Sequence, residues 1–243
     1  MFDLTWCLSA VALLLGCTVQ TAVGFGMALV AAPIIVVLNP LWVPYVLAVT
    51  ALVLSLGNTW NQRQHVQWRQ IVPPMISRIP GTMLGTWILM TLDTEWLQIL
   101  VAGMVMLAIL VTLKLKPFPS TTTNMSIAGF VSGITGTTTS IGGPPMALVM
   151  QHSAGHHARA NLSAYFVYSC IVSLIGYMTM DLMTTELWIS SLTMIPIAWL
   201  GFYLGKRLRP WVDNRFRPVL LALCGLSASI ALINAAMSIV LVA

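Results

Sequence analysis

The stretch "GITGTTTSIGGPPMALVM", residues 133–150, places four glycines, two consecutive prolines and five hydroxyl side chains in the middle of a very apolar chain. Glycine and proline both destabilise the interior of a helix. A second, weaker stretch of the same kind, "TVQTAVGFGMALVAAP", occupies residues 18–33. We therefore expect two helical segments that are each interrupted. The role of the interruptions is inferred from the surrounding sequence.

The composition indicates an all-α polytopic membrane protein. Of the 243 residues, 58% are hydrophobic and only 7% are charged, whereas a soluble domain carries about 25% charged residues. The net charge is +5, but basic and aromatic residues do not interleave in a patch, so we expect no nucleic-acid partner. Six apolar runs are long enough to cross a bilayer: 42–60, 71–92, 96–113, 161–180, 187–205 and 218–242.

Two further apolar regions contain the interruptions. Region 4–38 breaks near Gly24-Phe25-Gly26, and region 124–151 breaks near Gly142-Gly143-Pro144-Pro145. Each is expected to form a broken helical hairpin, either re-entrant or spanning the membrane fully.

The distribution of Lys and Arg predicts the orientation. Basic residues lie in the connections at 61–70, 114–116, 159 and 206–217, and are absent from 39–41, 93–95 and 181–186. The positive-inside rule places the basic connections in the cytoplasm. Each broken region then crosses an even number of times, and both termini are extracytoplasmic. This predicts two inverted repeats, residues 1–118 and 119–243, each a broken hairpin followed by three transmembrane helices.

A repeated glycine pattern is consistent with this division. "GTMLG" at 81–85 and "GFYLG" at 201–205 occupy equivalent helices of the two halves. Glycines four residues apart let helices approach closely in lipid, so packing is the expected role. Exposed glycine-rich faces also allow a homodimer.

Paired interruptions in inverted halves point to a transporter's binding site. Helix N-termini expose N–H groups and partial positive charge, which bind anions. Hydroxyl and amide donors precede both joints, and the candidate residues are Gln20 and Thr21 in the first half and Thr137, Thr138, Thr139 and Ser140 in the second. In the alternative interpretation the glycines serve packing and the threonines bond back to their own helices.

Arg78 is the most unusual charge in the sequence. It lies seven residues into the run 71–92, about 10 Å along the helix axis. No Asp or Glu lies well inside any span to neutralise it, which favours an anionic ligand. The alternative is that its side chain reaches back to the cytoplasmic surface.

Enzymatic chemistry is not expected. "HSAGHH", residues 152–157, resembles one histidine box of the membrane di-iron desaturases, but the chain has only four histidines. No G-x-S-x-G or H-E-x-x-H motif occurs. We expect no metal and no cofactor.

The two motifs "VGFGMALVAAPII" and "GITGTTTSIGGPPMALVM" resemble the paired motifs of the TauE/SafE sulfite-exporter family. The resemblance covers essentially the whole chain. It implies an inner-membrane permease for a small sulfur-containing anion such as sulfite, thiosulfate or an organosulfonate, working by alternating access. A passive anion channel with the same site is the alternative. The site residues that the resemblance implies are Gly24, Phe25, Gly26, Gly136, Thr137, Thr138, Thr139, Ser140, Gly142, Gly143 and Pro144.

Overall fold

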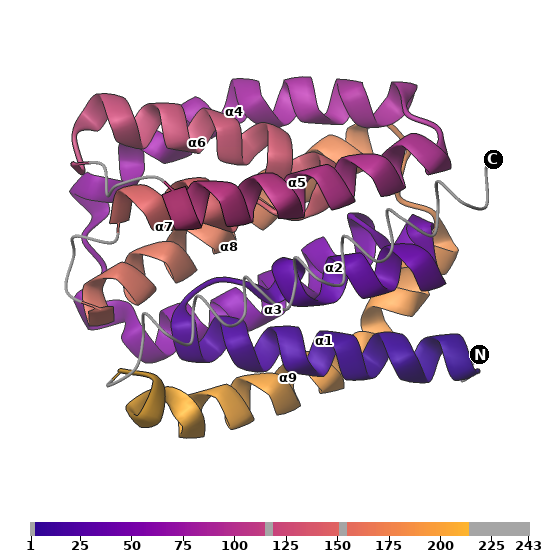
Figure 1. Cartoon of the computed structure of the whole chain (residues 1–243), viewed down its shortest axis with the longest axis horizontal. Helices are drawn as coiled ribbons and strands as arrows, with labels where there is room; N and C mark the ends of the chain where they lie inside the picture. Colours follow the sequence, from indigo (N-terminus) through magenta and orange to yellow (C-terminus); the bar gives the residue numbers. More distant parts are fainter. Residues whose placement is uncertain (1–2, 115–118, 151–154, 214–243) are drawn as a thin grey trace.

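The computed structural model describes residues 3–114, 119–150 and 155–213, and all secondary structure in these ranges is helical. The helices run side by side along the long direction of the molecule (Figure 1). In chain order the elements are α1 (Leu4–Val23), α2 (Met27–Leu38), η1 (Pro40–Trp42), α3 (Tyr45–Gln62), η2 (Arg63–His65), α4 (Trp68–Thr91), α5 (Thr94–Lys114), α6 (Thr122–Thr139), α7 (Gly143–Met150), α8 (Gly155–Thr179) and α9 (Thr185–Asp213). The expected run 218–242 lies outside the described residues.

The first interruption is a tight joint between α1 and α2. α1 begins after Asp3, whose carboxylate accepts a hydrogen bond from the Trp6 amide at 2.8 Å. It ends at Gly24, which has a φ of 107°, and Gly26 has a φ of 112° immediately before α2. Side chains strongly disfavour these left-handed conformations. Glycine at both positions therefore lets the chain leave one helix and enter the next within three residues.

The second joint lies between α6 and α7 and consists of Ser140, Ile141 and Gly142. Ser140 has a φ of 61° and ends α6, where its amide donates to the Gly136 carbonyl at 3.1 Å. The sequence places this break near Gly142 to Pro145, slightly later than the structure does. Pro144 and Pro145 lie in the first turn of α7, because a proline's fixed φ suits a helix start and its missing N–H breaks no helical bond there.

The other helices do not stop where their apolar runs stop. The largest difference is in α9, which continues to Asp213 although the apolar run is expected to end at residue 205. Similarly, α8 begins at Gly155 rather than at 161. Hydropathy marks only the part of a helix that suits lipid, whereas backbone hydrogen bonding continues into the polar ends. Arg159 and Arg209 are consequently helical residues and do not lie in loops.

Two pairs of helices approach closely through the repeated glycines. A Cβ atom on Gly85 of α4 would lie 2.9 Å from the Ile134 carbonyl oxygen of α6. In the same way, a Cβ on Gly205 of α9 would lie 2.5 Å from the Thr18 carbonyl oxygen of α1. These distances are shorter than real Cβ contacts, so the backbones touch because the side chains are absent. The packing role predicted for "GTMLG" and "GFYLG" is confirmed.

The outer surface is apolar. Large side chains with at least 60% of their surface exposed lie on helices throughout the bundle, among them Leu4, Ile76, Met83, Trp87 and Leu192. Three described helices are long and apolar enough to span a bilayer: Leu4–Val23, Gly155–Thr179 and Thr185–Pro210. An apolar exterior of this extent is unfavourable in water and suits lipid.

The connections divide by charge between the two ends of the bundle. In Figure 1, η2, the start of α8 and the end of α9 lie at the left end, and these regions carry basic residues. The connections α2–α3, α4–α5 and α8–α9, which lack Lys and Arg, lie at the right end. The basic connections therefore share one side of the molecule.

Candidate functional site

Arg78 of α4 is almost completely buried, with 1% of its surface exposed. Its Nη1 donates to the Ser132 carbonyl at 2.7 Å, to Ser132 Oγ at 3.0 Å and to the Tyr165 hydroxyl at 3.3 Å. Its Nη2 donates to Ser173 Oγ at 3.2 Å, whereas its Nε is buried without a hydrogen-bond partner. The side chain therefore points into the bundle, and the alternative that it reaches back to the membrane surface is wrong.

The positive charge of Arg78 is not neutralised by the groups that bind it, because all of them are neutral oxygen atoms. The acidic residues of the chain lie at helix ends: Asp3, Asp93, Glu95, Asp181, Glu186 and Asp213. A buried charge without a counter-charge is costly, and an anion bound beside it lowers that cost.

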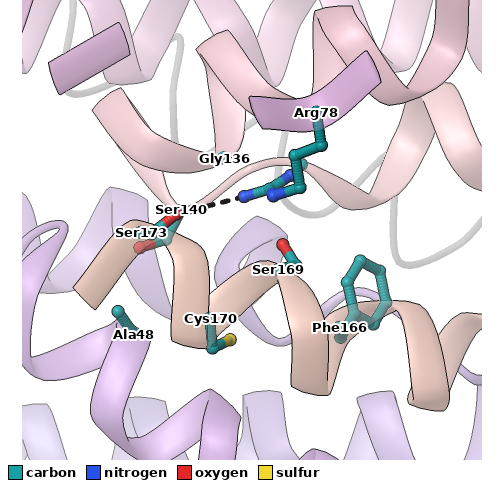
Figure 2. A pocket seen from close by; sticks show the side chains of 9 residues that line it. Ala48, Arg78, Gly136, Ser140, Phe166, Ser169, Cys170 and Ser173 are labelled. Atoms are coloured by element: carbon teal, nitrogen blue, oxygen red, sulfur yellow. Dashed lines mark hydrogen bonds between the residues drawn. The ribbon is translucent and has the colours of Figure 1, made fainter. Parts of the chain in front are cut away.

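A small cavity adjoins the guanidinium group. It has a volume of about 40 Å³, which exceeds the roughly 10–15 Å³ that a single water needs. Figure 2 shows Arg78 reaching toward Ser173 of α8, with Ser169 and Cys170 on the same helix. The lining residues come from four elements and the second joint: Ala48, Arg78, Gly136, Ser140, Gly142, Phe166, Ser169, Cys170 and Ser173. The cavity offers space for a few water molecules beside a full positive charge.

A second cavity of about 40 Å³ lies between the two joints. The first joint approaches the start of α7, since a Cβ on Gly143 would lie 3.3 Å from Phe25 Cβ. Ser140 and Phe166 line both cavities. The full lining of the second cavity is Gln20, Gly26, Ala28, Leu29, Ser140, Ile141, Gly143, Pro144 and Phe166.

The structure divides the candidate residues from the sequence into two groups. Those that line one of the two cavities are Gln20, Gly26, Arg78, Gly136, Ser140, Gly142, Gly143 and Pro144. Those that line neither of them are Thr21, Gly24, Phe25, Thr137, Thr138 and Thr139. Of these residues, Gly136, Ser140 and Gly142 line the cavity beside Arg78, whereas the threonines before the second joint line neither cavity.

The threonine hydroxyls already have partners. Thr138 Oγ1 donates to the Ile134 carbonyl at 2.9 Å, and Thr139 Oγ1 donates to the Thr135 carbonyl at 2.8 Å. Thr137 shares a hydrogen bond of 3.0 Å with Ser173. Hydroxyls that bond back to their own helix use their only proton, so Thr138 and Thr139 have none left for an anion.

Three serines that lie around Arg78 were not singled out in the sequence: Ser132, Ser169 and Ser173. Ser132 orders the site, because its Oγ accepts from Arg78 and donates to the Gly142 carbonyl at 2.6 Å. On α8, the buried polar residues Tyr165, Ser169, Ser173 and Tyr177 recur every four residues. That spacing places them on one helix face, and it is the signal that could have revealed them.

Two more arginines lie close to the first joint. Arg209 Nη2 donates to the Thr21 carbonyl and to Asn58 Oδ1, both at 3.1 Å. Arg159 is 4% exposed, and its Cγ would lie 2.8 Å from a Cβ on Gly24. Positive charge therefore gathers around both joints, which favours anions over cations there.

The histidines form a separate cluster. The ring centroids of His65 and His156 are 5.0 Å apart, those of His156 and His157 are 4.2 Å apart, and His157 Nδ1 lies 2.9 Å from the His65 carbonyl oxygen. Within the described ranges, no group of three or more His, Cys, Asp or Glu side chains is arranged to hold a metal ion. The cluster joins η2 to the start of α8.

Apolar spanning helices, an apolar exterior and a buried charge together define a multi-pass membrane protein. A family model described as "Sulfite exporter TauE/SafE" matches residues 8–231, nearly the whole chain, and the chain belongs to this family. The members are transporters and not enzymes, so this protein is a membrane transporter. No curated protein and no solved structure matches the chain.

Proposed function

We propose that the protein is a secondary permease that carries a small anion, such as sulfite, thiosulfate or an organosulfonate, through a site at Arg78. The observation that carries this proposal is the buried guanidinium, which has only neutral partners and an adjoining cavity. The family name supports a sulfur oxyanion as the solute. The bound anion supplies the counter-charge that the protein lacks.

Alternating access fits the burial of the site. With 1% of its surface exposed, Arg78 is shielded from bulk water by the described part of the chain, as the binding site of a closed carrier would be. A passive channel would need a continuous aqueous path past the same donors. This burial favours a carrier over a channel.

We infer that the chain consists of two inverted halves, residues 1–118 and 119–243, that rock against each other. The packing of α4 on α6 through Gly81 and Gly85 has a counterpart in the packing of α9 on α1 through Gly201 and Gly205. Both joints also follow a helix that ends in a left-handed residue, Gly24 or Ser140. These equivalences support the internal symmetry that alternating access requires.

We further propose that the protein lies in the inner membrane with both termini extracytoplasmic. The gathering of the basic connections at one end of the bundle supports this orientation (Figure 1).

Transport by purified protein in proteoliposomes tests the proposed function. Wild-type vesicles should take up thiosulfate or methanesulfonate, and Arg78→Gln should reduce uptake about 100-fold or more. Two charged hydrogen bonds, each contributing about 1.5–3 kcal/mol, account for this loss. Arg207→Gln is the matched control, because Arg207 is an exposed arginine of α9. Wild-type uptake in Arg78→Gln would remove Arg78 from the site.

Conductance measurements separate the two mechanisms. A carrier should give no unitary currents in planar bilayers that contain the same anions. Resolved single-channel currents would instead support the passive channel.

A further inference from the structure

The two joints can be aligned residue by residue. The Gly24 amide donates to the Gln20 carbonyl at 2.7 Å, and the Ser140 amide donates to the Gly136 carbonyl at 3.1 Å. Each of these bonds closes the last turn before a joint. Gln20 therefore occupies the position in the first half that Gly136 occupies in the second.

At the first joint, the Gln20 side chain satisfies the start of α2. Its Oε1 accepts from the Met27 amide at 3.3 Å, and its Nε2 donates to Ser55 Oγ at 3.4 Å. Gln20 and Ser55 are both buried. A neutral side-chain oxygen thus already lies where a helix N-terminus would otherwise attract an anion.

At the second joint, Gly136 leaves that place open and Arg78 enters it. A Cβ on Gly136 would lie 3.0 Å from Arg78 Nη2 and 3.3 Å from Nη1. The first turn of α7 contains Pro144 and Pro145, which have no N–H to offer. The second joint therefore attracts anions mainly through the guanidinium group.

The donors that Arg78 keeps free suit an oxyanion. Its Nε is unpartnered, and Nη2 carries two N–H groups, of which one donates to Ser173. A guanidinium group has a planar fork of five N–H donors that matches two oxygen atoms of one anion. A halide offers a single acceptor atom, so the two N–H bonds would have to converge on it and could not run parallel.

We propose that the transporter binds a single oxyanion, side-on to Arg78 at the second joint, and that Gln20 takes the place of an anion at the first joint. This inference rests on the proposed function and makes the two otherwise similar joints unequal. Gly136 is then a specificity-determining position, because a side chain there forces the guanidinium group to move by a few tenths of an ångström.

Calorimetric titration of purified full-length protein with sodium methanesulfonate tests this inference, with sodium chloride at equal ionic strength as the reference. We expect one methanesulfonate per wild-type chain. Gly136→Ala should weaken its binding at least about tenfold through loss of one charged contact. Gly103→Ala is the matched control, because nothing lies within 4 Å of a Cβ at that position.

Gln20→Ala is a second variant that tests the inequality of the two joints if Gly136→Ala does not fold. It should lower the unfolding temperature, because the Met27 amide loses its partner, whereas Arg78→Gln should abolish methanesulfonate binding. If Gln20→Ala instead abolishes binding as Arg78→Gln does, or if the wild type binds two anions, the inequality of the joints is wrong but the proposed function stands. If the wild type binds neither methanesulfonate, thiosulfate nor sulfite, both proposals fail.

Discussion

Replacing Gly133 with alanine should force α4 and α6 apart. A Cβ on Gly133 would lie 2.7 Å from the Arg78 carbonyl oxygen and 2.9 Å from Gly81 Cα. Both obstacles are backbone atoms, which cannot rotate away. To reach ordinary contact at 3.4 Å, the helices must separate by about 0.5–0.7 Å. The neighbouring residue, Ser132, accepts two hydrogen bonds from Arg78, so the same movement disturbs the site.

The cost of the helix separation is obtained by comparing the unfolding free energy of Gly133→Ala with that of Gly103→Ala in α5. Alanine stabilises a helix interior by about 1 kcal/mol relative to glycine, and this gain applies to both variants. Only Gly133→Ala also overfills a packed contact, which costs about 1–3 kcal/mol. The unfolding free energies of the two variants should therefore differ by about that amount. At about 2–4 °C per kcal/mol, the difference in unfolding temperature is roughly 2–12 °C.

Thermal unfolding of both variants in the same detergent gives this difference, and uptake into proteoliposomes gives the effect on the site. We expect Gly133→Ala to be less stable than Gly103→Ala and to transport more slowly. Equal unfolding temperatures with normal uptake would refute the argument that backbone contact between α4 and α6 positions Arg78.

Three further predictions concern other parts of the bundle. In a Cys7→Ser background, a cysteine introduced as Pro40→Cys should react with an impermeant thiol reagent in intact cells, and labelling only after lysis would reverse the proposed orientation. Gly24→Ala should lower the unfolding free energy by about 1–3 kcal/mol because of its positive φ, and an unchanged thermal midpoint would contradict this. Asn161→Ala removes the acceptor of the Gln67 amide at the start of α4, so the free energy of unfolding should fall by about 1 kcal/mol. An unfolding temperature equal to that of the wild type would contradict this.

The joints show how far local sequence determines local structure. Gly24 and Gly26 mark the first joint directly, since their positive φ values favour glycine. At the second joint the structure places the break at Ser140 to Gly142, because Pro144 and Pro145 are compatible with the first turn of a helix. The positions of glycine and proline thus locate a helix break to within a few residues, whereas the capping of the helix end determines at which residue the helix stops.

The candidate site shows the limit of the same reasoning. Arg78 stands out in the sequence as a charge inside an apolar run. Its partners Ser132, Tyr165 and Ser173 are 54 to 95 residues away along the chain. Serine and tyrosine are ordinary residues in membrane helices, so nothing in their own neighbourhoods assigns them to an arginine.

The sequence alone determined that the chain is apolar enough for a membrane, that two segments are interrupted, and that one arginine lies deep inside a span. These properties depend on composition and on backbone preferences, which act over a few residues. Only the tertiary structure decided that Arg78 turns inward, that the threonine hydroxyls are occupied, and that Gln20 fills one joint while Gly136 leaves the other open. Hydrogen bonding and burial depend on which helices become neighbours, and glycine contacts between distant segments establish those neighbours.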